Sequence, residues 1–283
     1  MMRIQVDTDA SSFTQAAMPH FREHPALNSF LLSIAIGRYA KDSKAPARLL
    51  RGLDQDSRTL IAGLQTAVDR PVSISNASAP VAAQFAEAIA SVASEFPGVV
   101  GPSPTVDAFA SAWSACKRNR VQVETNLGLF ELNAVRPLTS APGSFRLANT
   151  GDEQLILQWL KAFREEAVPN DPRQSDDELM ESIRMGIGQA QYFVWEWDGR
   201  CVCLVGSRRE TATERWIAPV YTPKHLRGRG FASSLVAAVS TRIVQSGKVG
   251  LLFVDLSNPV SKKVYERVGY VSIANFRHLS FSA

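Results

Sequence analysis

A glycine-rich loop between a strand-like run and a helix-like run constrains this 283-residue chain more than any other feature. The run that ends at Thr222 leads into a loop with Gly228 and Gly230, and a helical pattern extends from Gly230 to Val244. The first N–H groups of a helix have no partner inside the helix and carry partial positive charge, so such a loop can bind an anion. Glycines let the backbone come close to that anion. The segment therefore predicts an α/β unit with a phosphate or pyrophosphate site.

Two common phosphate loops are excluded by the spacing of this segment. The P-loop of nucleoside triphosphatases ends in Gly-Lys-Ser or Gly-Lys-Thr, and neither sequence is present here. A dinucleotide-binding loop needs three glycines in a fixed pattern, which this loop lacks. Arg227 and Arg229 add positive charge at the rim of the loop, which suits a bound pyrophosphate.

The loop resembles the pyrophosphate-binding motif of the GNAT superfamily of N-acetyltransferases, written Gln/Arg-x-x-Gly-x-Gly/Ala. Arg227, Gly230 and Ala232 occupy its defined positions. The resemblance extends over residues 143–283 and implies an α/β (α+β) fold with a mixed, mostly antiparallel sheet flanked by helices. It also implies that acetyl-CoA is the cosubstrate, that no metal takes part, and that an acetyl group passes to an amine.

A second block resembles the same superfamily further along the chain, where Asn258, Tyr265 and the pair Gly269-Tyr270 follow in the family's order. The resemblance implies that Tyr265 donates a proton to the departing thiolate of coenzyme A. Packing of this tyrosine in the helix core is the alternative. Asn258 is expected to bond the cofactor, or else to be only a turn residue, and Ser261 is expected to cap the helix that follows.

The strand from Ala218 to Thr222 precedes the loop, and by the same resemblance it separates from its neighbour in the sheet. Backbone groups of Val220 and Thr222 would then bond the pantetheine arm. The residues expected to contact coenzyme A are Val220, Tyr221, Thr222, Arg227, Gly228, Arg229, Gly230, Phe231, Ala232, Asn258 and Ser261.

No general base is assigned from the sequence. Candidates by rough position are Glu196, Glu214, Asp255 and His225, and a chain of water molecules would serve equally. The pair Glu165-Glu166, near the end of a predicted helix, either attracts a cationic amine or is simply solvated. The acceptor is therefore left open, as the amine of a small molecule or of a peptide or protein.

A segment from Arg136 to Ser144 with two prolines is typical of an interdomain linker and divides the chain into residues 1–142 and 143–283. The first half weakly repeats the order of elements in the second. Its predicted elements are the strand 71–75, the helix 81–93, the strand 99–101 and the helix 105–113. We expect a degenerate GNAT-like domain without a coenzyme A loop, with coincidence among common α/β elements as the alternative. Such a chain is a monomer with pseudo-dimeric halves or a homodimer.

Composition excludes several other classes of protein. Apolar residues make up 45% and charged residues 20% of the chain, as in a globular protein. The net charge of +4 comes from residues scattered along the sequence, so nucleic acid binding is not predicted. No stretch has the length and apolar character of a membrane span or a signal peptide, so no membrane association is expected.

The three cysteines favour a reducing compartment, because their odd number does not suit a disulfide framework, and we expect a cytoplasmic protein. Cys201 and Cys203 alternate in a strand-like run, whereas Cys116 stands alone. This spacing predicts that Cys201 and Cys203 face the same side of a sheet as core thiols.

The leading hypothesis for function is an acetyl-CoA-dependent N-acetyltransferase. A catalytically inactive acyl-CoA-binding sensor or scaffold is the alternative, because no base is evident and the first half looks degenerate. Transfer of an acyl chain longer than acetyl would use the same loop.

Overall fold

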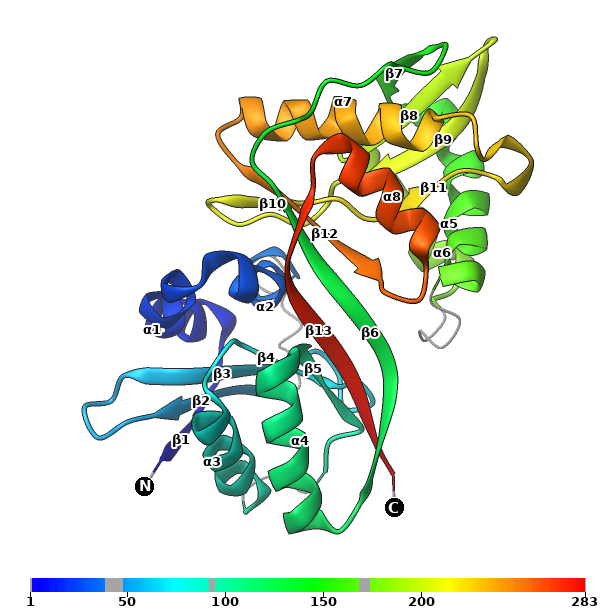
Figure 1. The fold of residues 1–283 in the computed structure, drawn as a ribbon. Coiled ribbons are helices and arrows are strands. Elements are labelled where there is room, and N and C mark those ends of the chain that lie inside the picture. The colour runs from blue at the N-terminus through cyan, green and yellow to red at the C-terminus, as the bar shows by residue number, and fades with distance from the viewer. Residues whose placement is uncertain (1, 39–47, 92–94, 168–173, 283) are drawn as a thin grey trace.

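The computed structural model describes residues 2–38, 48–91, 95–167 and 174–282. Two α/β halves are joined by a ribbon of two long strands, β6 (Arg120–Leu132) and β13 (Val271–Ser282), which run side by side between them (Figure 1). The predicted fold class is confirmed, since the sheets are mixed, mostly antiparallel and flanked by helices.

The first half contains most of the elements before the linker. They are β1 (Arg3–Asp7), α1 (Ala10–Glu23), α2 (Pro25–Arg38), β2 (Arg48–Leu53), β3 (Thr59–Gln65), β4 (Val72–Ile74), α3 (Ala79–Ala90), β5 (Gly98–Pro102) and α4 (Ser103–Lys117). Helices α1 and α2 cover one face of the sheet and α3 and α4 the other, each pair over its own apolar cluster. Of the predicted helix 81–93, residues 92 and 93 lie outside the described residues.

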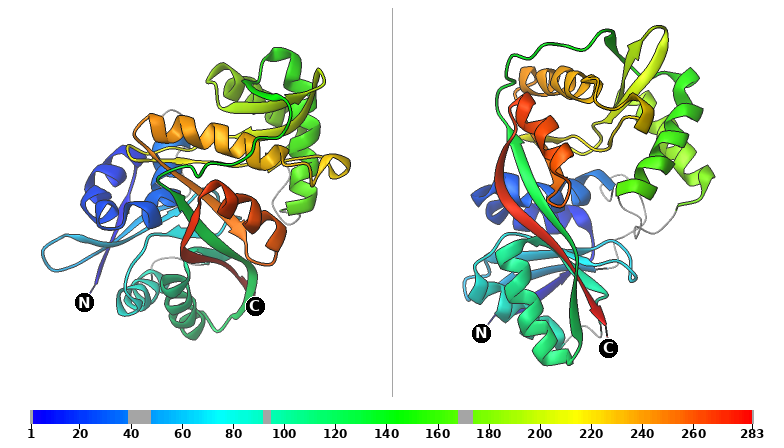
Figure 2. Two further views of the ribbon diagram at one scale, coloured as in Figure 1. Left: turned by 45° about the horizontal axis from the view of Figure 1, so that its top comes forward. Right: turned by 45° about the vertical axis from the view of Figure 1, so that its right-hand side comes forward.

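The second half repeats this order. Its elements are β7 (Ser144–Leu147), α5 (Glu153–Ala167), α6 (Asp176–Gly188), β8 (Tyr192–Trp197), β9 (Arg200–Gly206), β10 (Glu214–Trp216), β11 (Val220–Tyr221), α7 (Phe231–Gln245), β12 (Val249–Asp255) and α8 (Pro259–Val268). Helices α5 and α6 pack on one face of β8 and β9, and α7 packs on the other (Figure 2).

The two halves exchange their last strands. β6 pairs with β12 of the second half, from Leu127 opposite Asp255 to Leu132 opposite Gly250. β13 pairs with β5 of the first half, and β6 and β13 pair with each other along most of their length. A single nine-stranded sheet therefore runs through both halves.

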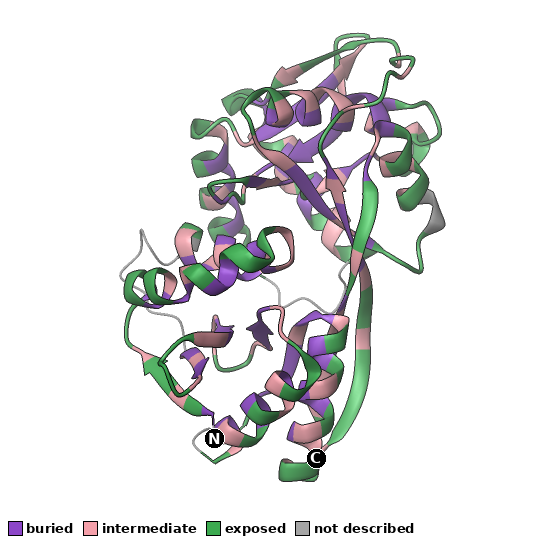
Figure 3. Cartoon of the chain, turned by 60° about the vertical axis from the view of Figure 1, so that its left-hand side comes forward, coloured by how far each residue is buried: buried purple, intermediate pink, exposed green. Residues whose placement is uncertain are grey.

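Among the described residues, each strand of the ribbon has part of its outer edge unpaired. β12 pairs only with the C-terminal part of β6, and most residues in the N-terminal part of β6 are exposed (Figure 3). Where the halves meet, Phe30 of α2 packs against Trp216 and Phe253 of the second half. The Trp216 indole N–H donates to the Ser29 hydroxyl at 2.9 Å. Both halves thus contribute to one aromatic cluster.

The predicted orientation of the two cysteines in β9 is wrong. Cys201 packs with the α5 and α6 cluster, whereas Cys203 packs with the α7 cluster on the opposite face. A β-bulge causes this difference, because Trp195 lies opposite Cys203 and Glu196 lies opposite Cys201, which leaves Val202 as an extra residue. The extra residue reverses the alternation of the strand.

Candidate functional site

The second half opens a gap in its sheet where the sequence predicted a splayed strand. β10 pairs in parallel with β12 as far as Trp216 opposite Leu251, and the chain then leaves β12. Among the described residues β11 pairs with β9 alone, so the run from Arg215 to Tyr221 forms parts of two short strands in two sheets. We call the space between β11 and β12 the wedge.

The backbone of β11 presents polar groups to the wedge. The Gly206 N–H donates to the Pro219 carbonyl at 2.8 Å, which makes these two residues a hydrogen-bonded pair across β9 and β11. Since such pairs alternate along antiparallel strands, the backbone groups of Val220 and Thr222 point away from β9. They face the wedge, as expected for groups that bond an extended ligand. The Thr222 carbonyl already accepts a hydrogen bond from Arg227 Nε at 2.8 Å.

The glycine loop leaves the start of α7 without a side-chain cap. Gly228 and Gly230 have φ angles of 79° and 83°, in the left-handed region that favours glycine. Gly230 is the N-cap of α7 and has no side chain to accept from the first helical N–H groups. Phe231 is buried in the α7 cluster and fixes the helix start, while Ala232 stays half-buried. The first turn of α7 therefore offers unpaired N–H donors beside an exposed loop.

Arg227 is held on the opposite side of the sheet from α7. Its Nη2 bonds the Glu166 carboxylate of α5 at 2.7 Å, and its guanidinium lies 5.8 Å from the centre of the Tyr221 ring. The Tyr221 hydroxyl bonds the other Glu166 oxygen at 3.3 Å. Arg227 lowers the pKa of Glu166 through this hydrogen bond. The side chain thus bridges from the loop to α5.

Arg229 extends on the α7 side instead. Its guanidinium lies 5.7 Å from the centre of the Trp197 ring, and Trp197 packs against Phe231 at 5.6 Å. The exposed residues Lys224 and His225 add further polar groups to the same loop, in the turn before Arg227.

Tyr265 reaches the base of the wedge from α8. Burial raises the pKa of its phenol, and the nearby Cys203 thiol raises it further. Cys203 lies under β11, where the Thr222 hydroxyl donates to its sulfur at 3.2 Å. No hydrogen bond holds the Tyr265 hydroxyl among the described residues. The phenol is therefore protonated and available to a ligand.

Asn258 and Ser261 form the start of α8. The Asn258 side-chain oxygen accepts from the Ser261 N–H at 3.1 Å, so Asn258 is the N-cap. The prediction that Ser261 caps this helix is wrong, since the helix begins two residues earlier at Pro259. Asn258 is exposed and lies three residues after the end of β12, which places it at the mouth of the wedge.

The four candidate bases are placed differently. Glu196 forms an ion pair with Arg146 at 2.7 Å. Glu214 is buried at the far end of β10, where the hydroxyls of Thr211 and Thr213 donate to it. His225 is exposed in the loop, and Asp255 accepts from the Ser257 N–H at 2.8 Å at the wedge end of β12.

In the first half, the position that corresponds to the wedge is closed. β4 stays hydrogen-bonded to β3 and β5 on both sides, so no strand separates there. The chain after it is bonded by protein groups: Asn28 Oδ1 accepts from the Asn76 N–H at 2.8 Å. The Thr105 hydroxyl accepts from the Ala77 N–H at 3.1 Å and donates to its carbonyl at 2.9 Å.

Sequence reasoning missed three side chains around the wedge and the loop. Glu166 was considered only for an amine, Cys203 only as a core thiol, and Trp197 not at all. No local pattern identifies them, since each meets the site through a partner distant in sequence. Arg227 and Glu166, for example, are 61 residues apart.

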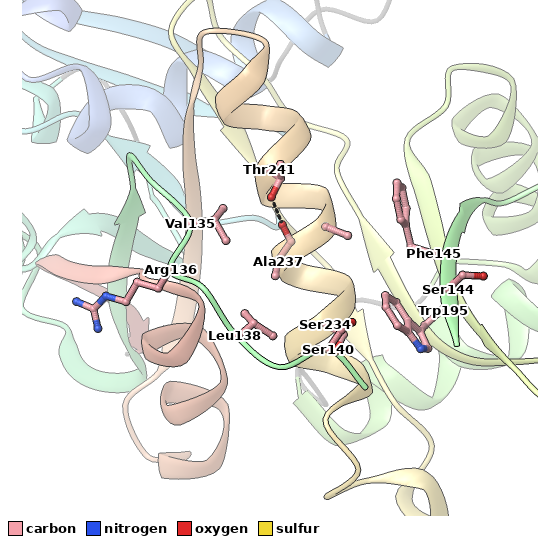
Figure 4. A pocket seen from close by; sticks show the side chains of 11 residues that line it. Val135, Arg136, Leu138, Ser140, Ser144, Phe145, Trp195, Ser234, Ala237 and Thr241 are labelled. Carbon is pink, nitrogen blue, oxygen red and sulfur yellow. Dashed lines mark hydrogen bonds between the residues drawn. The ribbon is translucent and has the colours of Figure 1, made fainter. Parts of the chain in front are cut away.

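A separate hollow of about 390 Å³ lies between the linker and the outer face of α7 (Figure 4). Leu138 of the linker, Phe145 of β7 and Ala237 of α7 are among the residues that line it. None of the predicted site residues lines this hollow.

Among the described residues, no group of three or more His, Cys, Asp or Glu side chains could hold a metal ion. Within the same residues, no helix has the length and apolar character to cross a membrane.

Comparisons with known proteins agree with this architecture. Residues 208–279 match a family model described as FR47-like protein. A GNAT-family acetyltransferase structure from Colwellia psychrerythraea is 12% identical, with a TM-score of 0.63, and the match covers 99% of this chain and 98% of that one. A GCN5-related N-acetyltransferase from Sphaerobacter thermophilus is 15% identical, with a TM-score of 0.62 and coverage of 99% and 95%.

The tandem arrangement has a counterpart among solved structures as well. A tandem GNAT protein from the clavulanic acid biosynthesis pathway is 8% identical, with a TM-score of 0.57, and the match covers 100% of this chain and 98% of that one. At these identities the likeness concerns the fold. The search of curated proteins found no match.

Proposed function

We propose that this chain, which has the tandem fold of the GNAT acetyltransferases, transfers an acetyl group from acetyl-CoA to an amine. The observation that carries the proposal is the wedge between β11 and β12, with an uncapped helix start on one side of it and the Tyr265 phenol at its base. The match of residues 208–279 to the FR47-like family supports the same part of the chain as the working half.

The residues fit coenzyme A in two places. The unpaired N–H groups at the start of α7 suit the pyrophosphate, because several donors and the helix dipole act on one anion. The backbone of Val220 and the N–H of Thr222 suit the amides of the pantetheine arm. Each hydrogen bond to a charged phosphate oxygen contributes about 1.5–3 kcal/mol, so a few of them dominate affinity. Arg229, Asn258 and Ser261 border this path.

Acetyl-CoA supplies an activated acyl group as a thioester. The neutral acceptor amine attacks the thioester carbonyl, a C–N bond forms, and the C–S bond breaks. Tyr265 donates its proton to the departing thiolate, and the proton lost by the amine passes to water or to a base at the mouth of the wedge. The half-buried phenol suits the role of an acid, because desolvation raises its pKa and keeps it protonated at neutral pH. Asp255 is the candidate base nearest that mouth.

The first half has a different role in this proposal. Its closed β4 and bonded backbone leave no room for the same cofactor site, so it acts as a structural partner of the second half. We propose a monomer with pseudo-dimeric halves that acts in the cytoplasm on the amine of a small molecule or a peptide.

The proposal is tested at Gly230 by calorimetry with coenzyme A and acetyl-CoA. Asp and Asn both tolerate a left-handed backbone better than other side chains, so Gly230→Asp and Gly230→Asn are matched in shape and differ in charge. We expect micromolar binding by the wild type and a Kd at least tenfold higher for Gly230→Asp than for Gly230→Asn, because a carboxylate at the helix start repels the pyrophosphate.

Each other outcome has a clear meaning. Equal affinity of the two variants would place the pyrophosphate elsewhere. Lack of binding by the wild type would remove the proposed function. Binding without transfer to any amine would favour the sensor or scaffold.

A further inference from the structure

The phosphate loop is attached to the helix on the other face of the sheet. α7 and α5 pack on opposite faces of β8 and β9, and the loop belongs to α7. Arg227 nevertheless leaves the loop in the direction of α5, around the end of β11. An arginine that served only to hold a phosphate at the start of α7 would have no reason to point away from it.

Three contacts fix the Arg227 side chain in this direction. Nε donates to the Thr222 carbonyl at 2.8 Å, and Nη2 donates to Glu166 at 2.7 Å. The guanidinium also lies over the Tyr221 ring, whose hydroxyl bonds the same carboxylate. The Arg227 side chain thus joins the end of β11, the phosphate loop and the end of α5 in one network of contacts.

The network includes a carboxylate, that of Glu166, at an unfavourable position. Glu166 lies in the last turn of α5, where the helix dipole disfavours a carboxylate. Arg227 compensates for it, because it lowers the pKa of Glu166 and keeps it ionised. The neighbouring Glu165 lies in the same turn and is exposed, as Glu166 is, but it has no contact with this network among the described residues.

We propose that Glu166 is a positioning residue for the cofactor site. Through Arg227 it holds the phosphate loop and the end of β11 in the conformation that receives coenzyme A. In this proposal, which rests on the function proposed above, Arg227 acts as a strut between the loop and α5. Arg229, on the α7 side of the loop, is then the arginine that meets the phosphates.

The strut and a direct phosphate ligand predict opposite effects at Glu166. If Arg227 is a strut, Glu166→Ala loosens the loop and weakens cofactor binding. If Arg227 is a phosphate ligand, Glu166 competes with the phosphate, and Glu166→Ala tightens binding because a nearby negative charge is removed. Whether Glu166→Ala weakens or tightens the binding of coenzyme A therefore distinguishes a strut from a phosphate ligand.

The experiment combines hydrogen exchange of the ligand-free protein with coenzyme A titration. Glu166→Ala, Arg227→Ala, the double variant and the control Glu165→Ala are compared with the wild type. We expect exchange in residues 223–232 to be several-fold faster in all three variants of the pair, with no change in the control. The Kd should rise about five- to tenfold in each of them, and the double variant should be no worse than either single variant.

Turnover gives a readout that general destabilisation would not reproduce. At saturating acetyl-CoA, Glu166→Ala should keep kcat within about twofold of the wild type, so that only KM changes. Tighter binding by Glu166→Ala, additive losses in the double variant, or unchanged exchange of the loop would each overturn the strut. A wild type that does not bind coenzyme A would refute the proposed function, while the exchange data would still decide whether Glu166 positions the loop.

Discussion

Tyr265 and Tyr270 offer a test of the proposed acid within one pair of touching rings. Their ring centres are 6.1 Å apart in an edge-to-face contact. The Tyr270 hydroxyl shares a buried hydrogen bond of 2.9 Å with the Ser240 hydroxyl, whereas the Tyr265 hydroxyl has no such bond among the described residues. Replacing each tyrosine by phenylalanine removes one oxygen atom and leaves the ring. One variant should lose catalysis and the other should lose stability.

The expected magnitude for Tyr265→Phe follows from the leaving group. General acid catalysis contributes about 10²–10⁴-fold in rate. A thiol has an ordinary pKa of about 8.5, so a thiolate is a good leaving group and needs little help. We therefore expect kcat to fall about 100-fold, or about 2.7 kcal/mol, with KM and the Kd for coenzyme A unchanged. Because no hydrogen bond is lost, the melting temperature should stay within about 2 °C.

Tyr270→Phe should behave in the opposite way. The loss of a buried hydrogen bond costs about 1–3 kcal/mol, and kcat should stay close to the wild-type value. Initial rates, calorimetry and thermal unfolding of the two variants supply the comparison. An unchanged kcat in Tyr265→Phe would refute the assigned role, and an equal loss of kcat in both variants would show that ring packing controls the rate. Since burial raises the pKa of Tyr265, loss of its proton should not lower kcat near pH 10 in the wild type.

Two further predictions concern the fold. Cleavage at a protease site inserted between Pro137 and Ser140, in the exposed linker, should leave both fragments in one peak on size exclusion, because each half completes the sheet of the other; separation of the fragments would contradict the strand exchange. Arg146 lowers the pKa of the buried Asp152, so this carboxylate stabilises the fold above its unfolded pKa of about 3.9 and loses that effect as the pH falls through its folded value. Asp152→Asn should therefore lower the melting temperature at pH 7 and approach the wild type below about pH 3, and a difference that does not depend on pH would refute this linkage.

Local patterns were sufficient to predict the glycine loop and the elements around it. Gly228 and Gly230 adopt positive φ angles, and α7 begins after them as expected. Such features depend on residues close in sequence, where helix periodicity and capping act. The break between β10 and β11 followed from a family resemblance, since nothing in the run from Arg215 to Tyr221 marks a change of sheet.

Contacts between distant segments could not be predicted in the same way. The bulge at Val202 turns Cys203 toward Tyr265, and a single extra residue of this kind leaves no mark on an apolar strand. The direction of Arg227 depends on Glu166, which lies on another helix. The partners of β6 were missed because an alternating strand looks the same whichever sheet it joins. The alternation of apolar residues specifies which face of a strand is buried, but it does not specify which strand pairs beside it.

The strand exchange gives the first half an effect on the candidate site although it has no glycine loop of its own. Without β6, the edge of β12 from Gly250 to Asp255 would lose its neighbour directly beside the wedge. An open edge there would expose unpaired backbone groups and weaken the strand that forms one wall of the site. α2 reinforces the same region, since Phe30 packs on Trp216 and Phe253. The first half thus acts on the candidate site through the sheet, and substitutions in β6 or α2 that loosen β12 should impair cofactor binding although neither element reaches the loop.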